Sequence, residues 1–257
     1  MPMRLRYLSD IHLEFLKPNK IPLIYKKILP INQEDVFILA GDIGNPFSTQ
    51  YDEFMQFMSN HCRKIFVIAG NHEYYQKKHT IVETQEMLKR CFEKYPNISF
   101  LNNSYENFEG FCFIGSTLWS HITKPEYEIN DVYSIPKFDY IKYNKLHRNC
   151  IEFLKETVPK TDRCIVITHH LPSNTLVDKK YKKPSMLPYN QWFSSDMDDF
   201  IRENKSNIAC WIYGHTHTPS KTDICGVPML CNPIGYPNEN SRHYFDETFV
   251  LPSVATI

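Results

Sequence analysis

The sequence Ile-Tyr-Gly-His-Thr-His at residues 212–217 closes a short apolar run with two histidines one residue apart. In an extended segment residues i and i+2 point to the same side, so His215 and His217 would face one point just past the end of a strand. Imidazole is the commonest metal-ligating side chain near neutral pH. Two surface histidines in a turn would show the same pattern, so this motif alone does not decide between a metal site and a plain turn.

Four more predicted strands, three of them apolar runs typical of buried strands, also end in residues that can ligate a metal. The strands and their residues are 4–8 with Asp10 and His12, and the apolar runs 36–40 with Asp42, 65–69 with Asn71, and 164–168 with His169. In open α/β sheets the loops at the carboxyl ends of several strands converge on one site. Each residue has an ordinary explanation by itself, as a helix cap, a turn residue or a core histidine. Five strands that all end this way indicate one shared metal site.

The number of candidate ligands indicates how many ions the site holds. Seven oxygen and nitrogen donors exceed the three or four protein ligands of a single zinc site. They suit two divalent ions that share a bridging carboxylate. Glycine is scarce, with eight in the chain, and Gly41, Gly44, Gly70 and Gly214 lie where an apolar run meets a polar cluster. Glycine there predicts close approach of the backbone to a ligand.

Composition limits the partners and the compartment. The 257 residues carry 29 Lys and Arg against 29 Asp and Glu, so no overall charge favours long duplex nucleic acid or a membrane surface. No apolar run reaches the length of a membrane span, and the first residues do not read as a signal peptide. The eight cysteines are scattered and form no C-x-x-C pair, which favours buried thiols in a reducing compartment. We therefore expect a cytoplasmic protein without membrane contact.

We expect a single domain over residues 1–257, because the chain has no repeat, low-complexity tract or long linker. A helix is predicted over about residues 79–95, with a core face of Val82, Leu88, Cys91, Phe92 and Tyr95. Surface excursions are predicted near residues 119–144 and 173–195. Their aromatic side chains either form a small core of the excursions, which we favour, or stack on a base. These aromatics are Tyr127, Tyr133, Phe138, Tyr140, Tyr181, Tyr189 and Trp192.

Taken together, these motifs resemble those of the calcineurin-like metallophosphoesterase superfamily. The matching motifs are Asp10-x-His12, Gly41-Asp42, Gly70-Asn71-His72-Glu73, His169 and Gly214-His215-x-His217. The resemblance covers nearly the whole chain, and the flanking sequences are similar to a compact bacterial-type branch. It implies a four-layer α/β/β/α sandwich of two mixed β-sheets flanked by helices, with a dinuclear metal site at the strand C-terminal ends. Ile234 departs from it, because the resemblance leads us to expect an arginine there; if that arginine holds phosphate, substrate preference would differ.

The resemblance also implies which residues hold each ion. One ion would be held by Asp10, His12 and His217, and the other by Asn71, His169 and His215, with Asp42 bridging both. The sequence does not show which of His169 and His170 turns inward, and we predict His169 because it directly follows the strand. The cofactors are expected to be two divalent ions, Mn²⁺ first, with Fe, Zn or Ni as alternatives.

Two further groups have candidate roles in catalysis or substrate binding. His72 follows a predicted ligand and is our candidate general acid for the leaving group; the alternative is a residue that orients Asn71. His170 and the lysines of residues 179–183 are candidate substrate contacts, although most short charge runs are solvated loops. The lysines are Lys179, Lys180, Lys182 and Lys183.

The predicted function is hydrolysis of a phosphoester. Two ions would lower the pKa of a bridging water, the expected nucleophile, and neutralise the phosphoryl oxygens. We predict a phosphodiesterase for a small or nucleotide-like substrate, with a phosphomonoesterase or protein phosphatase as the alternative. A scaffold that kept the fold and lost catalysis is disfavoured because every ligand is present. Long duplex nucleic acid is not an expected partner, and the sequence does not indicate an oligomeric state.

Overall fold

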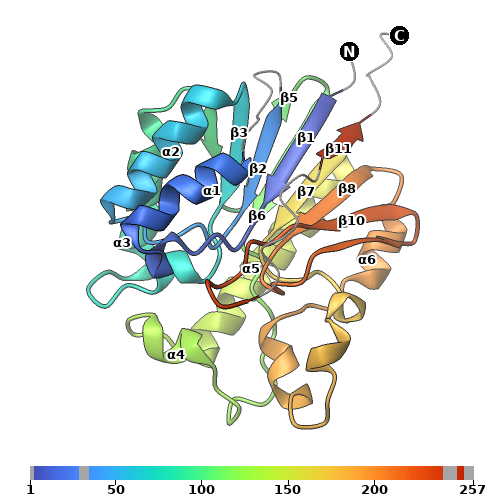
Figure 1. Cartoon of the computed structure of the whole chain (residues 1–257). Coiled ribbons are helices and arrows are strands. Elements are labelled where there is room, and N and C mark those ends of the chain that lie inside the picture. The colour runs from blue at the N-terminus through green and yellow to red at the C-terminus, as the bar shows by residue number, and fades with distance from the viewer. Residues whose placement is uncertain (1–2, 29–34, 240–247, 252–257) are drawn as a thin grey trace.

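A computed structural model describes residues 3–28, 35–239 and 248–251, which form two mixed β-sheets packed face to face (Figure 1). The first sheet has the strand order β11-β1-β2-β3-β4, and the second has the order β5-β6-β7-β8-β10-β9. The first comprises β1 (Met3–Leu8), β2 (Val36–Ala40), β3 (Lys64–Ile68), β4 (Ile98–Phe100) and β11 (Thr248–Leu251). The second comprises β5 (Ser104–Phe108), β6 (Phe111–Ser116), β7 (Cys164–Thr168), β8 (Ile208–Tyr213), β9 (Ser220–Ile224) and β10 (Val227–Cys231).

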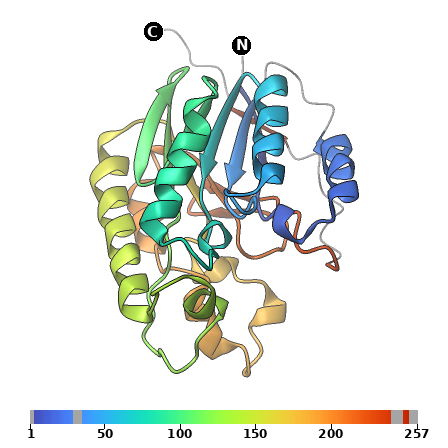
Figure 2. The same ribbon diagram turned by 90° about the vertical axis from the view of Figure 1, so that its left-hand side faces the viewer.

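Helices cover the outer faces of both sheets, so the predicted four-layer α/β/β/α sandwich is confirmed (Figures 1 and 2). The first group, beside the β1–β4 sheet, is α1 (Ile21–Ile28), α2 (Thr49–His61) and α3 (Ile81–Glu93). The second group is α5 (Tyr140–Thr157) and α6 (Asp198–Glu203), while α4 (Asn130–Ser134) lies beyond the sheets. No helix among the described residues is long and apolar enough to cross a membrane.

The unbroken apolar runs are explained by burial on both faces of each central strand. In β2, Val36 and Ile38 point into the layer between the sheets, whereas Phe37 and Leu39 point toward the helices. Side chains alternate along a strand, so a strand between two covered faces has no polar position. Phe66 of β3 stacks on Phe113 of β6 across the two sheets, with ring centroids 3.9 Å apart.

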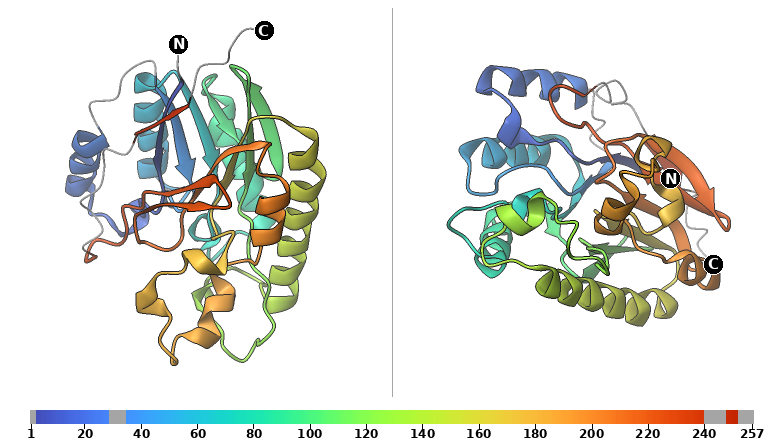
Figure 3. Two further views of the ribbon diagram at one scale, coloured as in Figure 1. Left: turned by 90° about the vertical axis from the view of Figure 1, so that its right-hand side faces the viewer. Right: turned by 90° about the horizontal axis from the view of Figure 1, so that it is seen from below.

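The central strands of each sheet run parallel, which brings their carboxyl ends to one end of the molecule. β1, β2, β3 and β4 pair in parallel, as do β6, β7, β8 and β10. Beyond the strand ends the two sheets are joined, because Ser9 after β1 forms a bridge with Pro233 after β10. Residues 119–144 and 173–195 lie next to each other at this same end (Figure 3).

Three local predictions differ from the structure. Val82 was expected on the core face of its helix but is 67% exposed, because α3 buries Thr84, Leu88, Cys91 and Phe92 instead. The edge strand β5 was not predicted, since its residues alternate between intermediate and exposed positions and lack an apolar run. The predicted excursion over residues 119–144 includes α4 and the first turn of α5.

Candidate metal centre

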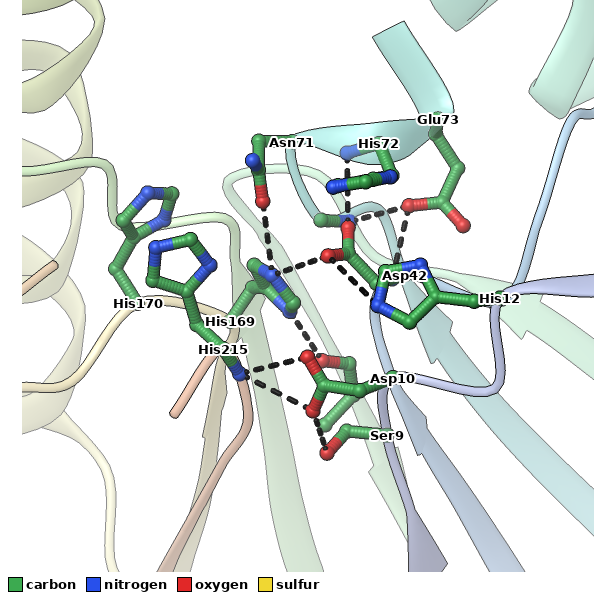
Figure 4. Close-up of polar contacts among 12 residues, drawn as sticks. Ser9, Asp10, His12, Asp42, Asn71, His72, Glu73, His169, His170 and His215 are labelled. Atoms are coloured by element: carbon green, nitrogen blue, oxygen red, sulfur yellow. Dashed lines mark hydrogen bonds and ion pairs between the residues drawn. The ribbon is translucent and has the colours of Figure 1, made fainter. Parts of the chain in front are cut away.

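All seven predicted ligands lie together where the strands of both sheets end. Metal-ligating atoms form one compact group from Asp10, His12 and His217, and a second from Asp42, His169 and His215. His12 links the groups, because its Nε2 lies 3.8 Å from Asp42 Oδ2. Asn71 extends the second group, with Oδ1 3.1 Å from His169 Nε2. Figure 4 shows Asp42 between His12 and His169, in the position of a bridging carboxylate.

The backbone at the predicted ligands is not extended. The alternation of an extended segment, from which we expected His215 and His217 to face one point, therefore does not apply. Five of the ligands adopt the left-handed region, with φ of 53° at Asp10, 52° at His12, 55° at Asp42, 67° at His215 and 48° at His217. His215 and His217 therefore do not face one point: His215 joins the Asp42 group and His217 joins the Asp10 group. Non-glycine residues with positive φ are uncommon and cluster at functional sites, where the surrounding structure holds them.

Hydrogen bonds between neighbouring loops hold these turns. The N–H of Asp10 donates to Gly41 O at 3.0 Å, and the N–H of His12 donates to Asp42 O at 3.0 Å. The loops after β1 and β2 thus continue the pairing of the strands past their ends. Gly70 allows the close approach that its sequence position predicted, because a Cβ there would lie 2.2 Å from Asp42 Oδ1.

Glu73 holds the loop that carries Asp42. Its two carboxylate oxygens accept backbone N–H groups from Asp42 at 3.0 Å, Ile43 at 2.7 Å, Gly44 at 3.2 Å and Gly70 at 2.7 Å. Burial and the nearby Asp42 charge raise the pKa of Glu73 to about 7, although the N–H groups of Gly44 and Gly70 oppose this shift. Four donors aimed at two oxygens define Glu73 as an acceptor that positions the loop.

Oxygen acceptors behind the histidines determine which ring nitrogen faces the site. The Nδ1 atom of His12 lies 3.0 Å from Glu14 Oε1, that of His217 lies 2.6 Å from Glu239 Oε2, and that of His169 lies 2.9 Å from Ala40 O. In a neutral imidazole Nδ1 then carries the proton and Nε2 presents a lone pair. Metal-ligating histidines commonly donate their other N–H to such an acceptor.

The inward-facing nitrogens form an arrangement that a cation would stabilise. The Nε2 atoms of His12 and His217 lie 3.0 Å apart, and both face the centre of the site. His215 Nε2 is buried and has no hydrogen-bond partner in the described part of the chain. A buried polar atom without a partner costs free energy, and a metal ion would provide that partner. The donor set therefore fits divalent metal binding.

Charges within the site shift the pKa values of its groups. Burial opposes ionisation of Asp42, but His169 and His72 outweigh it and hold the pKa of that carboxyl well below its usual range. Burial likewise opposes protonation of His169, yet Asp42 raises the pKa of that imidazole to about 9. For His217, hydrogen bonds to Asp10 and Glu239 overcome burial and raise the pKa to about 10.

His72 lies beside these two groups and forms a third cluster of possible ligand atoms with His12 and Glu14. Its backbone N–H donates to Asp42 Oδ1 at 2.8 Å, and its Nδ1 lies 3.0 Å from Glu14 Oε1. Its Nε2 lies 3.2 Å from the hydroxyl of Tyr236. Burial favours the neutral ring, but Asp42 and Glu14 raise the pKa of His72 above its ordinary value.

The structure separates His169 from His170. His169 Nε2 lies 3.2 Å from Asp42 Oδ2, whereas both nitrogens of His170 are occupied by Thr117 O at 3.1 Å and Tyr143 Oη at 2.9 Å. Burial and the neighbouring His169 lower the pKa of His170 to about 3. His170 points away from Asp42 in Figure 4 and is not among the described residues that line the adjoining pocket.

A pocket of about 360 Å³ opens onto the site. Its metal-site wall includes Asp42, Asn71, His72, His215 and His217, and both excursions contribute the opposite wall. The lysines predicted as substrate contacts are exposed and are not among the described lining residues, so the geometry does not support that prediction. These are Lys179, Lys180, Lys182 and Lys183. Ile234 is buried in the core.

Sequence reasoning gave no role to several carboxylates that complete the site. Glu73 is part of the motif of residues 70–73, and Glu14 lies two residues after His12. Their positions in the sequence could therefore have indicated a role at the site. Glu239 and Asp131 carry no such signal, because Glu239 lies in a loop and Asp131 in the short helix α4, both far along the chain from the motif residues they approach. Asp131 accepts a hydrogen bond from Asn71 Nδ2 at 2.9 Å, which turns the amide oxygen of Asn71 toward His169.

The fold and the paired ligand groups define a metal-dependent phosphoester hydrolase of the α/β/β/α class. A model for calcineurin-like phosphoesterases matches residues 3–219, and the chain belongs to this family. It is 32% identical to an uncharacterized protein of Acanthamoeba polyphaga mimivirus over 93% of each chain. It is 22% identical to the 3′,5′-cyclic adenosine monophosphate phosphodiesterase CpdA of Haemophilus influenzae, over 82% of this chain and 65% of that protein.

The fold also matches a solved structure. Phosphopantetheinyl hydrolase (PptH) from Mycobacterium tuberculosis superimposes with a TM-score of 0.76 at 16% identity, covering 100% of this chain and 98% of that one. This likeness confirms the architecture. The bacterial-type branch that we expected stays a prediction.

Metal binding should release protons. Because the pKa values of His169 and His217 are about 9 and about 10, both rings are in the positively charged imidazolium form at pH 7.5 before metal is added. A metal ion takes the neutral ring, so we expect proton release on Mn²⁺ binding at pH 7.5 and less release at pH 9.5. The stabilisation that the protonated rings give the metal-free fold is full below about pH 6.5 and is lost as pH rises through about 9–10.

Calorimetry in two buffers of different ionisation enthalpy measures the protons released per ion. His217→Gln removes one of the two titrating rings and should release fewer protons. Binding at pH 7.5 with no proton release would contradict this description of the site.

Proposed function

We propose that this chain is a dinuclear metal-dependent phosphodiesterase that acts on a small or nucleotide-like substrate. The observation that carries the proposal is the lining of the pocket. Among the described residues that line it there is no lysine or arginine, while Asp42, Asp131 and Glu239 contribute carboxylates. Two metal ions would then be the main positive charge available to a phosphoryl group.

The charge of the substrate supports diester over monoester preference. A phosphomonoester carries about −1.5 to −2 charges near neutral pH, whereas a diester carries one. Enzymes clamp transferring phosphoryl groups with cations such as Arg, Lys or metal ions. The extra charge of a monoester would face Asp131 and Glu239, with no lysine or arginine among the described lining residues to balance it, and Ile234 stands where the family resemblance led us to expect an arginine. The pocket therefore favours the singly charged diester.

The shape of the pocket supports a substrate with an organic group on each side of phosphorus. Beyond the metal ligands its wall combines apolar residues, Leu171, Val177, Met186 and Phe193, with polar ones that include Asn130, Asp131, Asn190 and Glu239. Apolar walls with a few placed polar groups are typical of small-molecule sites. The cyclic nucleotide phosphodiesterase activity in the name of the Haemophilus influenzae relative is consistent with such a substrate.

We assign the ligands as two sets. One ion would be held by Asp10, His12 and His217, the other by Asn71, His169 and His215, with Asp42 shared between them; two of the three clusters of possible ligand atoms support this division. Mixed imidazole and oxygen donors suit Mn²⁺, with Fe, Zn or Ni as alternatives. When bound, the ions supply Lewis acidity and an activated water as nucleophile.

The protein's own contribution is positioning and proton transfer. We propose that His72 gives a proton to the departing alcohol, because the charges of Asp42 and Glu14 favour its protonated form and it lines the pocket. Glu14 holds the ring by its Nδ1 side, which leaves Nε2 toward Tyr236 and the pocket. A phosphomonoesterase with the same ligands is the second candidate.

A matched pair of aryl esters tests the diester preference. We expect the Mn²⁺-loaded protein to hydrolyse bis(p-nitrophenyl) phosphate with a higher kcat/KM than p-nitrophenyl phosphate. Asp42→Ala removes the bridging carboxylate and should reduce both activities to background. Exposed Lys183→Ala is the control that should keep full activity. A higher kcat/KM for the monoester would replace the phosphodiesterase with a phosphatase.

The leaving group tests the role of His72. His72→Ala should keep both metal ions and lose about 10²–10⁴-fold in kcat on a diester with an alkyl leaving group. The loss should be much smaller with p-nitrophenolate, which leaves without a proton. Metal content by mass spectrometry separates this effect from ligand loss. Unchanged kcat on the alkyl ester would exclude the acid role.

A further inference from the structure

Tyr236 lies over the candidate metal centre, in the turn that follows β10. Its ring centroid lies 4.5 Å from that of His12 and 4.5 Å from that of His217. Phe15 packs edge-on against the same ring at 5.5 Å between centroids. The side chain is partly buried and lines the pocket. Tyr236 therefore packs against two predicted ligands and also borders the space where a substrate would bind.

Backbone hydrogen bonds fix the position of this ring independently of its hydroxyl. The N–H of Gly235 donates to Asp10 O at 2.9 Å. The N–H of Tyr236 donates to Glu239 Oε2 at 2.8 Å, and the same carboxylate oxygen lies 2.6 Å from His217 Nδ1. The turn is thus joined to Asp10 and His217, so removal of the hydroxyl alone should leave the ring in place.

The hydroxyl of Tyr236 lies at the nitrogen of His72 that can face a substrate. His72 Nδ1 lies 3.0 Å from Glu14 Oε1, and a carboxylate at that distance accepts the Nδ1–H. The proton that His72 can give to a substrate is therefore the one on Nε2, and Nε2 lies 3.2 Å from the Tyr236 hydroxyl. A tyrosine hydroxyl can accept one hydrogen bond while it donates another.

We propose that Tyr236 is a catalytic residue that passes a proton from His72 to the departing oxygen of the phosphoester. As the bond between phosphorus and that oxygen breaks, its electron pair moves to the oxygen, which takes the hydroxyl proton of Tyr236. Tyr236 takes the Nε2 proton of His72 in return and stays neutral, and His72 is left neutral until solvent protonates it again. This relay rests on the proposed function for the acid role of His72, but it does not require a diester.

The Tyr236→Phe variant tests the relay with two aryl diesters that differ in their leaving group. The variant loses the hydroxyl and keeps the ring that packs on His12 and His217. On diphenyl phosphate, whose phenolate is the more basic leaving group, the Mn²⁺-loaded full chain should lose about 10²-fold in kcat. On bis(p-nitrophenyl) phosphate, whose leaving group departs without a proton, kcat should change by less than about twofold.

Two further measurements separate a proton path from support of the fold. Metal content by mass spectrometry and KM for both esters should be unchanged in Tyr236→Phe, because the ring and backbone contacts remain. The His72→Ala/Tyr236→Phe double variant should be no slower on diphenyl phosphate than His72→Ala alone, since residues that act as a unit have non-additive effects. Tyr105→Phe removes a hydroxyl from the exposed side chain of Tyr105 on the edge strand β5 and should keep full activity.

Several results would overturn the relay. Equal losses in Tyr236→Phe on both diesters would place the hydroxyl on the phosphoryl oxygens instead of the departing oxygen. Lower metal content in this variant would give the hydroxyl a structural role. Losses on diphenyl phosphate that add up in the double variant would show that Tyr236 and His72 act independently.

The relay and the proposed function can fail separately. A wild-type preference for monoesters would overturn only the phosphodiesterase, and phenyl phosphate and p-nitrophenyl phosphate would then replace the two diesters in the same comparison. A Tyr236→Phe variant with unchanged kcat on diphenyl phosphate, beside a His72→Ala variant that is slow on it, would overturn the relay and leave the acid role of His72 in place.

Discussion

The structure depends most on how imidazole lone pairs are directed toward the centre of the site. Each of three histidines donates its outer N–H to an oxygen. The acceptor is Glu14 for His12, the carbonyl of Ala40 for His169, and Glu239 for His217. The inner nitrogens of these rings face the common centre, and those of His12 and His217 lie 3.0 Å apart. His215 Nε2 is buried without a hydrogen-bond partner in the described part of the chain. A divalent ion would supply that partner, and metal binding would then be coupled to folding.

The two sheets contribute different ligands to the common centre. The first sheet supplies Asp10, His12, Asp42 and Asn71 from the ends of β1, β2 and β3, and the second supplies the histidines after β7 and β8. The left-handed turns at these ends strain the backbone, and hydrogen bonds between adjacent loops compensate, as at Asp10 and Gly41. The bridge between Ser9 and Pro233 fixes the sheets to each other beside the metal ligands.

The sequence predicted which residues lie together at the strand ends because most of these ends are marked twice, by an apolar run and by the polar residue that stops it. That these residues ligate metal stays a prediction. The same signal placed β2, β3 and β7 to within one residue. It could not predict the left-handed turns, since the alternation of an extended segment ends where the strand does. Glu239 and Asp131 were missed because the placement of a loop and of the short helix α4, which periodicity does not encode, brings them to the site. Val82 was misplaced because the helical face was fixed by Leu88 and Phe92, and Val82 lies off that face.

Anomalous diffraction from crystals of the Mn²⁺-loaded protein tests the central claim most directly. We expect two peaks about 3.5–4 Å apart, one among Asp10, His12 and His217 and the other among Asn71, His169 and His215, with the Asp42 carboxylate between them. A single peak, or two ions of which neither contacts Asp42, would contradict it.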